Sequence, residues 1–254
     1  MQVTQLYIYP VKSLGGICVQ QAWVTQRGLQ YDRRYMLIDE SGTFLTQRTL
    51  HQLALFKLKL LENGFEITFN GQSVELPFAM EGNKIRASVW DDKLEVTLAA
   101  DEYNQWFSNA LKKNVRLVYM HDNSERPVSI KYAHHNEQVS FADAYPVLLI
   151  SEASLDLLNS RLDETLGMDR FRPNIVVNNL GAHEEDELAS FEINRVLFKT
   201  AKPCARCVVT TINQQTLETS KEPLATLAKY RMHDNKINFG VNVICLSEGQ
   251  IACQ

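Results

Sequence analysis

Two Asn-Gly dipeptides, Asn63-Gly64 and Asn70-Gly71, separate three short apolar runs in the first third of the chain. Asn-Gly between alternating apolar runs is the strongest local signal for a β-hairpin, because Asn and Gly accept the positive φ that a tight hairpin turn needs. The runs 53–61, 65–69 and 74–76 therefore predict a meander of three strands.

The same strand pattern fills the rest of the first 120 residues. Strands are expected at 35–39 and 43–47, on either side of Glu40-Ser41-Gly42, and at 84–90 and 93–98, with a turn at Asp91-Asp92. Apolar residues at helical spacing behind Asp101 predict one short helix before a strand at 115–120.

Longer helices begin after about residue 125. Ser151 is expected to cap a helix whose apolar face runs to Leu166 and which ends at Gly167, and a second helix starts near Pro223. Residues 175–177, 195–199, 208–211 and 238–246 predict buried strands. The fold class is therefore α+β and β-rich, with domains at 1–122 and 123–254.

Composition places the chain among ordinary globular proteins, because 45% of its 254 residues are hydrophobic and 22% are charged. Its 26 Lys+Arg against 30 Asp+Glu leave a net charge of −4, which argues against a nucleic-acid partner. Apolar stretches such as 241–246 are too short to span a bilayer, and the N-terminus lacks the features of a signal peptide. We expect a cytoplasmic protein without a membrane partner, whose 5 cysteines are reduced thiols.

The motif Cys204-Ala205-Arg206-Cys207 needs a specific explanation. Lys202-Pro203 disfavours a helix before it, and a strand is expected at 208–211, so the thiols should lie in a loop at a strand edge. Lys202 and Arg206 are neighbouring cations, and cations favour the thiolate, the form that binds metals or attacks substrates.

Four interpretations of this cysteine pair remain open. A structural zinc site needs four ligands, but His134 and His135 are adjacent to each other and His183 stands alone. A thioredoxin-type dithiol usually opens a helix rather than a strand. One thiolate is enough for a metal whose other ligands come from a cofactor. The simplest interpretation is two small buried residues.

Several cations stand at predicted strand ends and suggest one anion site built by both halves of the chain. Pro173 forces Arg172 into an extended geometry that presents its guanidinium at the start of a strand, which suits a phosphate or carboxylate. Lys12 and Ser13 precede two glycines, whose turn exposes backbone N–H groups to anions. Arg33 and Arg48 add further cations, although solvated charges at sheet edges explain them as well.

Acidic residues give weaker signals. Asp143 lies in the loop before a core strand, where its carboxylate faces a cleft or caps a turn. The acidic run 183–187 has a metal-like composition, but a solvated loop explains it better.

Eight motifs taken together resemble a known family, in order and over nearly the whole chain. They are Tyr9–Ser13, Asp32-Arg33, Thr46–Arg48, Ser151–Leu155, Phe171–Asn174, Cys204–Thr211, Lys221–Leu224 and Phe239–Asn242. This pattern resembles the MOSC family, named after the C-terminal domain of molybdenum cofactor sulfurase, in the branch of the mitochondrial amidoxime-reducing component and its bacterial relatives.

The resemblance implies a fold and a cofactor. The fold is an N-terminal β-barrel-like domain followed by a mixed β-barrel and helix domain, and the cofactor is the molybdenum cofactor, molybdopterin. Cys207 matches the molybdenum ligand, and Asp143 matches an acid close to the metal, where it would act as a general acid if burial raises its pKa. The residues expected to bind the cofactor are Lys12, Ser13, Arg33, Arg48, Arg172, Asn174, Arg206 and Asn242.

The implied activity is the reduction of N-hydroxylated small molecules to amines or amidines. The chain has no C-x₄-C-x₂-C run for an iron–sulfur cluster, so electrons are expected from a separate ferredoxin-like protein, flavoprotein or cytochrome. The alternative is a protein that carries molybdenum cofactor or sulfur without reductase activity.

Overall fold

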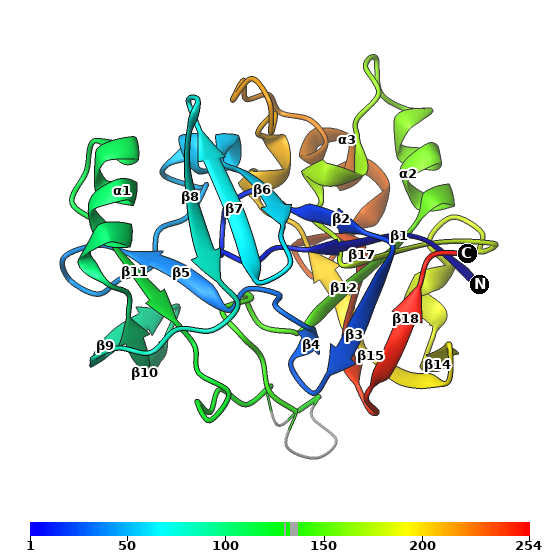
Figure 1. Cartoon of the computed structure of the whole chain (residues 1–254). Helices are drawn as coiled ribbons and strands as arrows, with labels where there is room; N and C mark the ends of the chain where they lie inside the picture. Colours follow the sequence, from blue (N-terminus) through cyan, green and yellow to red (C-terminus); the bar gives the residue numbers. More distant parts are fainter. Residues whose placement is uncertain (130, 133–136) are drawn as a thin grey trace.

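The computed structural model of the chain describes residues 1–129, 131–132 and 137–254 and is shown in Figure 1. Its largest sheet has 8 strands, and seven of them form a continuous path to which β16 adds by pairing with β17. The path runs through β14 (Ser190–Ile193), β15 (Val196–Ala205), β17 (Lys236–Cys245), β12 (Val147–Ser151), β13 (Ile175–Asn178), β1 (Gln2–Ile8) and β2 (Ile17–Val19), with β16 at Met232–His233.

Three smaller sheets complete the β-structure of the described residues. The first contains β5 (Tyr35–Ile38), β11 (Arg116–Tyr119), β10 (Asp92–Leu98) and β9 (Lys84–Val89). The second contains β18 (Gly249–Ala252), β3 (Gln21–Thr25) and β4 (Gly28–Leu29), and the third is the meander β6 (Lys57–Leu60), β7 (Gly64–Phe69) and β8 (Gln72–Pro77). The expected three-stranded meander is confirmed, and Asn70 and Gly71 form its second turn with φ of 48° and 78°. The strand expected at 53–61 is shorter, because residues 51–55 form a 3₁₀ helix, and Gly64 of the expected first turn already belongs to β7.

The helices are short, and the longest has 11 residues (Figure 1). The α-helices are α1 (Asp101–Leu111), α2 (Glu152–Asn159) and α3 (Leu224–Arg231), and the 3₁₀ turns are η1 (His51–Leu55), η2 (Met168–Arg170), η3 (Glu184–Glu187) and η4 (Val208–Thr211). All three predicted α-helical regions are present, and the predicted β-rich α+β class is confirmed.

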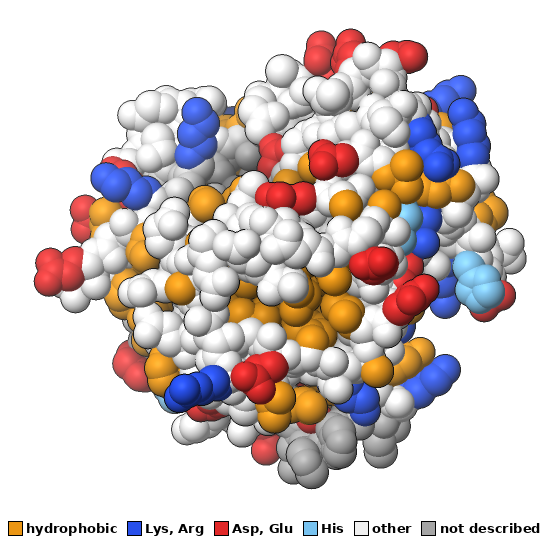
Figure 2. Space-filling view, turned by 90° about the vertical axis from the view of Figure 1, so that its right-hand side faces the viewer, with side chains coloured by type: hydrophobic (Ala, Val, Ile, Leu, Met, Phe, Trp, Pro, Cys, Tyr) orange, Lys and Arg blue, Asp and Glu red, His pale blue; other side chains and the backbone are white. Residues whose placement is uncertain are grey.

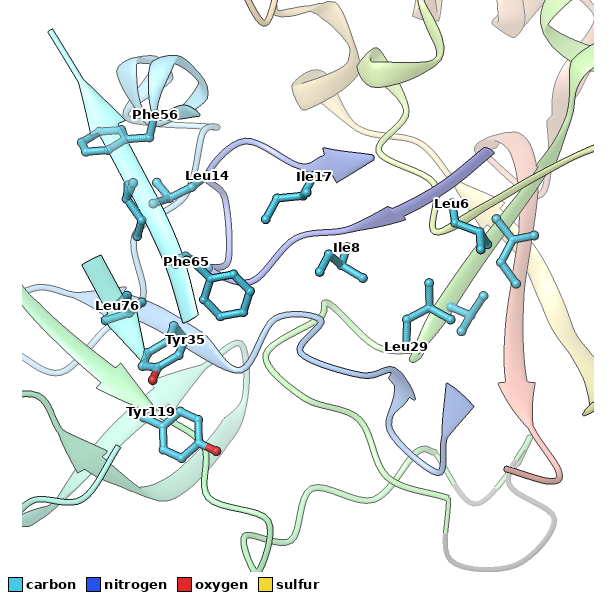
Figure 3. Close-up of a cluster of buried hydrophobic side chains, with 14 of the residues drawn as sticks. Leu6, Ile8, Leu14, Ile17, Leu29, Tyr35, Phe56, Phe65, Leu76 and Tyr119 are labelled. Carbon is cyan, nitrogen blue, oxygen red and sulfur yellow. The ribbon is translucent and has the colours of Figure 1, made fainter. Parts of the chain in front are cut away.

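The first strand of the chain belongs to the sheet built by its second half. β1 pairs antiparallel with β13, with Leu6 opposite Ile175. One hydrophobic core contains Phe65 and Leu76 of the meander together with Val147 and Val241 of the large sheet. Figure 3 shows its labelled members extending from β7 and β8 to β1 and β2. The division at residue 122 stays a prediction, and the two segments share a sheet and a core.

The expected strand at 208–211 is wrong, because these residues form the 3₁₀ turn η4. The hydroxyl of Thr210 donates to the carbonyl of Cys207 at 3.0 Å, and the hydroxyl of Thr211 donates to that of Val208 at 2.8 Å. Such local hydrogen bonds stabilise the 3₁₀ turn, although the β-branched residues favour a strand. The strand next to the cysteine pair is β15, which precedes Cys207 and contains Cys204.

Other predicted elements have different bounds. Helix α2 has the expected cap, since the Ser151 hydroxyl accepts from the Ser154 N–H, but it ends at Asn159 rather than near Gly167. The side chain of Asn159 bonds both the N–H and the carbonyl of Leu166, at 2.8 and 3.1 Å, which folds the following segment back.

Two predictions in the first half also need correction. Asp92 pairs with Val89, so the β9–β10 hairpin turns at Trp90-Asp91 and not at Asp91-Asp92. Residues 43–47 form no strand; Phe44 makes an isolated bridge to Ile38.

One face of the molecule is shown in Figure 2, which looks at the right-hand side of Figure 1. Hydrophobic side chains gather in its middle, and positive and negative side chains are interspersed around them.

None of the helices in the described ranges combines the length and apolar character that crossing a bilayer requires.

The close approach of β17 to β12 depends on Gly240. Its φ is +72°, and a Cβ there would lie 2.6 Å from Ile150 Cγ1 and 2.8 Å from the Leu149 carbonyl.

We predict that Gly240→Ala lowers the free energy of unfolding in urea by about 2–4 kcal/mol, because alanine is disfavoured in left-handed backbone and its Cβ would clash with these atoms. The control is Gly71→Ala, with a φ of +78° and nothing within 4 Å, which should cost only about 1–2 kcal/mol. Equal losses would contradict the clash.

Candidate functional site

Strand pairing brings distant segments to one edge of the large sheet. Since β1 and β13 are antiparallel, the segment after Ile8 meets the segment before Ile175, and the Tyr7 N–H donates to the Asn174 carbonyl at 2.9 Å. β12 runs parallel to β13, so the loop before Val147 reaches the same edge.

From this edge, a row of neighbouring residues leads across the strands of the sheet to the cysteine pair. Asn174 donates its N–H to the Leu148 carbonyl, Leu148 lies opposite Asn242, and Asn242 lies opposite Lys202, two residues before Cys204. Leu148, Asn174 and Asn242 of this row form the floor of a cavity that residues of the first half of the chain also line.

Every sequence-predicted site residue lines this one cavity. They are Lys12, Ser13, Arg33, Arg48, Asp143, Arg172, Asn174, Arg206, Cys207 and Asn242. Cys204, Gln47 and Tyr145 are among the other lining residues. Both halves of the chain therefore line one cavity, and its use as an anion site stays a prediction.

Asn174 holds the centre of the cavity floor and is only 1% exposed. Its Oδ1 accepts from Arg33 Nη1 at 3.0 Å and from the Leu148 N–H at 3.2 Å. Its Nδ2 donates to the Tyr7 carbonyl at 3.1 Å and to Asp32 Oδ1 at 3.0 Å. Since a side-chain amide has two donors and one acceptor oxygen, Asn174 is fully used inside the protein and positions its neighbours.

Two guanidinium groups lie against one buried tyrosine. The Cζ atoms of Arg33 and Arg172 are each 4.3 Å from the ring centroid of Tyr9. Arg33 Nη1 also bonds the buried carboxylate of Asp32 at 2.7 Å. Arg172 makes no ion pair within the described part of the chain, and burial lowers its pKa to about 10. An anion near Arg172 would offset this loss of solvation.

Three residues that line the cavity have a strained backbone. Ser13, Arg33 and Arg172 have φ of 68°, 48° and 55°, in the left-handed region that residues other than glycine rarely adopt. The extended geometry expected for Arg172 before Pro173 is therefore wrong. Strained residues persist where the surrounding structure fixes them, and they cluster at functional sites.

Lys12 and Asp143 form an ion pair on one wall of the cavity. Lys12 Nζ is buried and lies 2.6 Å from Asp143 Oδ1 and 2.7 Å from the Phe141 carbonyl. Burial raises the pKa of Asp143, but the Lys12 ion pair and hydrogen bond, together with Arg48 and the Trp90 N–H, outweigh it and hold the pKa below its usual range. The condition for a general acid, a net pKa raised by burial, is therefore not met, and the carboxylate is an anion that accepts hydrogen bonds.

The Cys207 thiol is partly buried and contacts a cation from the first half of the chain. Arg48 Nη2 lies 3.4 Å from Cys207 Sγ and 3.4 Å from Asp143 Oδ2. Lys202, the cation expected beside the thiols, instead has its Nζ over the rings of Tyr132 and Tyr145, at 5.4 and 5.1 Å from their centroids. Arg48, and not the expected Lys202, is therefore the cation next to Cys207.

The second thiol, Cys204, has a different cation. Arg206 Nη1 donates to Cys204 Sγ at 3.1 Å, and Nη2 donates to the Phe171 carbonyl at 2.6 Å. Arg206 Nε is buried without a partner, so one donor of this guanidinium is still available.

The charge balance of the cavity fits an anionic, phosphorylated ligand. Its lining includes five cations, Lys12, Arg33, Arg48, Arg172 and Arg206, and one carboxylate, Asp143. The thiol of Cys207 adds a soft sulfur donor on the same lining. Guanidinium groups match phosphate in geometry, and a thiolate suits a soft metal, so these residues fit the molybdenum cofactor.

The histidines add no metal site in the described ranges. There, no group of three or more His, Cys, Asp or Glu is placed to hold a metal ion by itself. His134 and His135 lie outside the described residues. The His183 ring lies 5.7 Å from the Tyr230 ring and 5.9 Å from the Phe239 ring, and both its nitrogens are buried without partners.

Two contributors to the site escaped sequence reasoning. Trp90 donates from Nε1 to Asp143 Oδ1 at 3.3 Å, and Gln47 is buried and donates to the Ser13 carbonyl at 2.7 Å. Gln47 stands within a quoted motif. The sequence placed Trp90 at the end of a strand, so no local signal linked it to Asp143.

Fold and cavity together define a β-rich protein in which two chain segments enclose a thiol and a surplus of cations. Residues 1–114 match the MOSC N-terminal beta barrel domain, and residues 136–254 match the MOSC domain. The chain belongs to the MOSC family.

Curated relatives agree with this assignment. The chain is 34% identical over 245 residues to mitochondrial amidoxime-reducing component 1 of Mus musculus, covering 91% of this chain and 72% of the relative. It is 34% identical over 244 residues to mitochondrial amidoxime reducing component 2 of Bos taurus, covering 91% and 73%. It is 31% identical over 269 residues to molybdenum cofactor sulfurase of Drosophila grimshawi, where it covers 99% of this chain but 34% of the relative.

The Asn174 side chain, whose hydrogen-bonding groups are all in use, gives a stability prediction. Asn174→Ala should lower the free energy of unfolding by about 2–4 kcal/mol, because it removes the side-chain acceptor of the buried Leu148 N–H and one of the hydrogen bonds to the buried Asp32. The matched control is Asn242→Ala, which removes only a 3.4 Å contact to the Pro203 carbonyl. Urea denaturation of both variants is the measurement, and a smaller loss for Asn174 than for Asn242 would contradict the positioning role.

The lowered pKa of Asp143 gives a pH prediction. A carboxyl group whose pKa is lower in the folded than in the unfolded state stabilises the fold above its unfolded pKa, and loses that effect as the pH falls through the folded value. The urea midpoints of the wild type and Asp143→Asn should therefore differ most near neutral pH. The difference should begin to shrink as the pH falls below about 4. A difference that is constant down to about pH 2.5 would show that the ionised carboxylate does not stabilise the fold.

Proposed function

We propose that this protein is a molybdenum-cofactor-dependent oxidoreductase that reduces N-hydroxylated compounds to amines or amidines. The observation that carries the proposal is the juxtaposition of the Cys207 thiol with a surplus of cations in one cavity. The amidoxime-reducing names of the relatives supply the substrate class.

The chain offers separate groups for the two ends of the cofactor. Cys207 is the proposed ligand to molybdenum. Arg172, which has no ion pair in the described structure, and Arg206, whose Nε is unpartnered, are the proposed phosphate contacts. Lys12, Ser13, Arg33, Arg48 and Asn242 complete the proposed cofactor contacts, and Asn174 supports them from the floor.

When bound, the cofactor supplies a two-electron reduction in which the N–O bond breaks and two protons are taken up to give the amine or amidine and water. The chain binds and orients the substrate. Asp143 is held as an anion by Lys12 and Arg48, so it accepts a hydrogen bond from a substrate N–H instead of donating a proton. We retain Asp143 as a proposed catalytic residue in this accepting role.

Two partners follow from this proposal. One is an N-hydroxylated small molecule in the cavity. The other is a separate electron-donor protein of the ferredoxin-like, flavoprotein or cytochrome class. The expected cytoplasmic location stays a prediction.

A carrier of molybdenum cofactor or sulfur is the second candidate. The observation that favours it is that both thiols, Cys204 and Cys207, line the cavity. The sulfurase relatives also match, although the chain spans about a third of their length, as the 34% coverage shows.

The two candidates are separated by one set of measurements. The protein is produced in a host that makes molybdenum cofactor, and molybdenum and pterin are measured for the wild type, Cys207→Ser and Cys204→Ser. Reduction of benzamidoxime is then assayed with a chemical reductant. We expect Cys207→Ser to lose molybdenum and at least about 100-fold in activity, since even outer contacts of a metal site matter by about 10- to 100-fold.

Cys204→Ser is the matched control, because it removes a sulfur three positions away in the same cavity. It should keep its molybdenum. Equal molybdenum in the wild type and Cys207→Ser would defeat the ligand assignment. Retention of cofactor without any turnover would favour the carrier.

A further inference from the structure

Trp90 occupies an unusual position for a large aromatic residue. It stands at the turn of the β9–β10 hairpin with a φ of +54°, and its side chain is 44% exposed. Tight turns of this kind favour Asn, Asp or Gly, and a bulky residue in left-handed backbone is an outlier. The strained exposed tryptophan therefore calls for a reason beyond the hairpin itself.

The indole is fixed in place beside the cavity. Its Nε1 donates to Asp143 Oδ1 at 3.3 Å, and Arg48 Cζ lies 4.5 Å from its ring centroid. Phe44 packs against it edge-on, with the centroids 4.8 Å apart and the planes at 61°. Asp143 and Arg48 both line the cavity, so the indole, which does not line the cavity itself, contacts two residues that do.

Asp143 keeps one side open toward the same space. Oδ1 accepts from Lys12 and Trp90, and Oδ2 accepts from Arg48. An ionised carboxylate has about four acceptor positions, so one on Oδ2 is unused within the described structure. The side chain is 58% exposed, which leaves it accessible to a ligand N–H.

We propose that Trp90 and the open Oδ2 of Asp143 form a specificity subsite for flat, conjugated substrates. An aryl amidoxime places its planar π-system against the indole while its N–H donates to Oδ2. An aliphatic hydroxylamine offers the N–H but no flat surface. The inference rests on the proposed reductase activity, and it assigns to Trp90 the discrimination between these two kinds of substrate.

The test compares two substrates in four forms of the cofactor-loaded protein. The substrates are benzamidoxime and N-hydroxycyclohexylamine, and the variants are Trp90→Asn, Trp90→Phe and Trp23→Ala. Asn suits the left-handed turn, so Trp90→Asn should fold. Trp23 is the matched control, because it is 47% exposed on β3 and borders a different cavity.

We expect Trp90→Asn to lower the ratio of kcat/KM for benzamidoxime to kcat/KM for N-hydroxycyclohexylamine by about 3- to 10-fold, the range for one lost aromatic contact, chiefly through KM. Trp90→Phe should restore most of the ratio, and Trp23→Ala should keep the wild-type ratio. An unchanged ratio in Trp90→Asn would overturn the inference while leaving the reductase activity standing.

A binding measurement tests the subsite without turnover. Benzamidine, the product of benzamidoxime reduction, is titrated into each form while tryptophan fluorescence is recorded. A saturable change that persists in Trp23→Ala and disappears in Trp90→Phe supports the subsite, and a change that persists in Trp90→Phe contradicts it. Failure to reduce either substrate would defeat the proposed function, and the titration would still decide whether Trp90 contacts the ligand.

Discussion

The pairing of β1 with β13 is the constraint on which the site depends. It inserts the first strand of the chain into the sheet of the second half and sets the end of β1 against the start of β13. Lys12 and Ser13 then face the segment of Arg172 and Asn174 across the cavity. Because sheet register is fixed by backbone hydrogen bonds and by which side chains are buried, the relative positions of these residues are set by the fold.

Ion pairs between charged residues of the cavity explain why it is both polar and ordered. Asp32 pairs with Arg33, and Asp143 pairs with Lys12 and Arg48, while Arg172 has no carboxylate of its own in the described structure. Buried cations lose solvation, and an anionic ligand restores favourable interactions that water no longer provides. The protein thus keeps a surplus of positive charge for a ligand while its other charges hold the walls in place.

Local sequence signals were sufficient where neighbours along the chain determine the backbone. The Asn70-Gly71 turn and the Ser151 cap are examples, since each depends on a few adjacent residues. The same reasoning failed at 208–211, where β-branched residues indicated a strand but threonine hydroxyls bonded back to carbonyls. Propensity was outweighed by side-chain hydrogen bonds that a strand pattern does not reveal.

The sequence by itself determined which kinds of groups the site contains: a C-x-x-C pair, arginines at strand ends and an acid before a core strand. Only the tertiary structure decided their partners. Arg48 reaches Cys207 from 159 positions away, while the nearby Lys202 lies over two tyrosine rings. The direction of the pKa shift of Asp143 was also beyond the sequence, because it is set by burial opposed by charges on Lys12 and Arg48. The net pKa shift depends on the distances in space between these groups, and those distances are set only when the strands have paired into sheets.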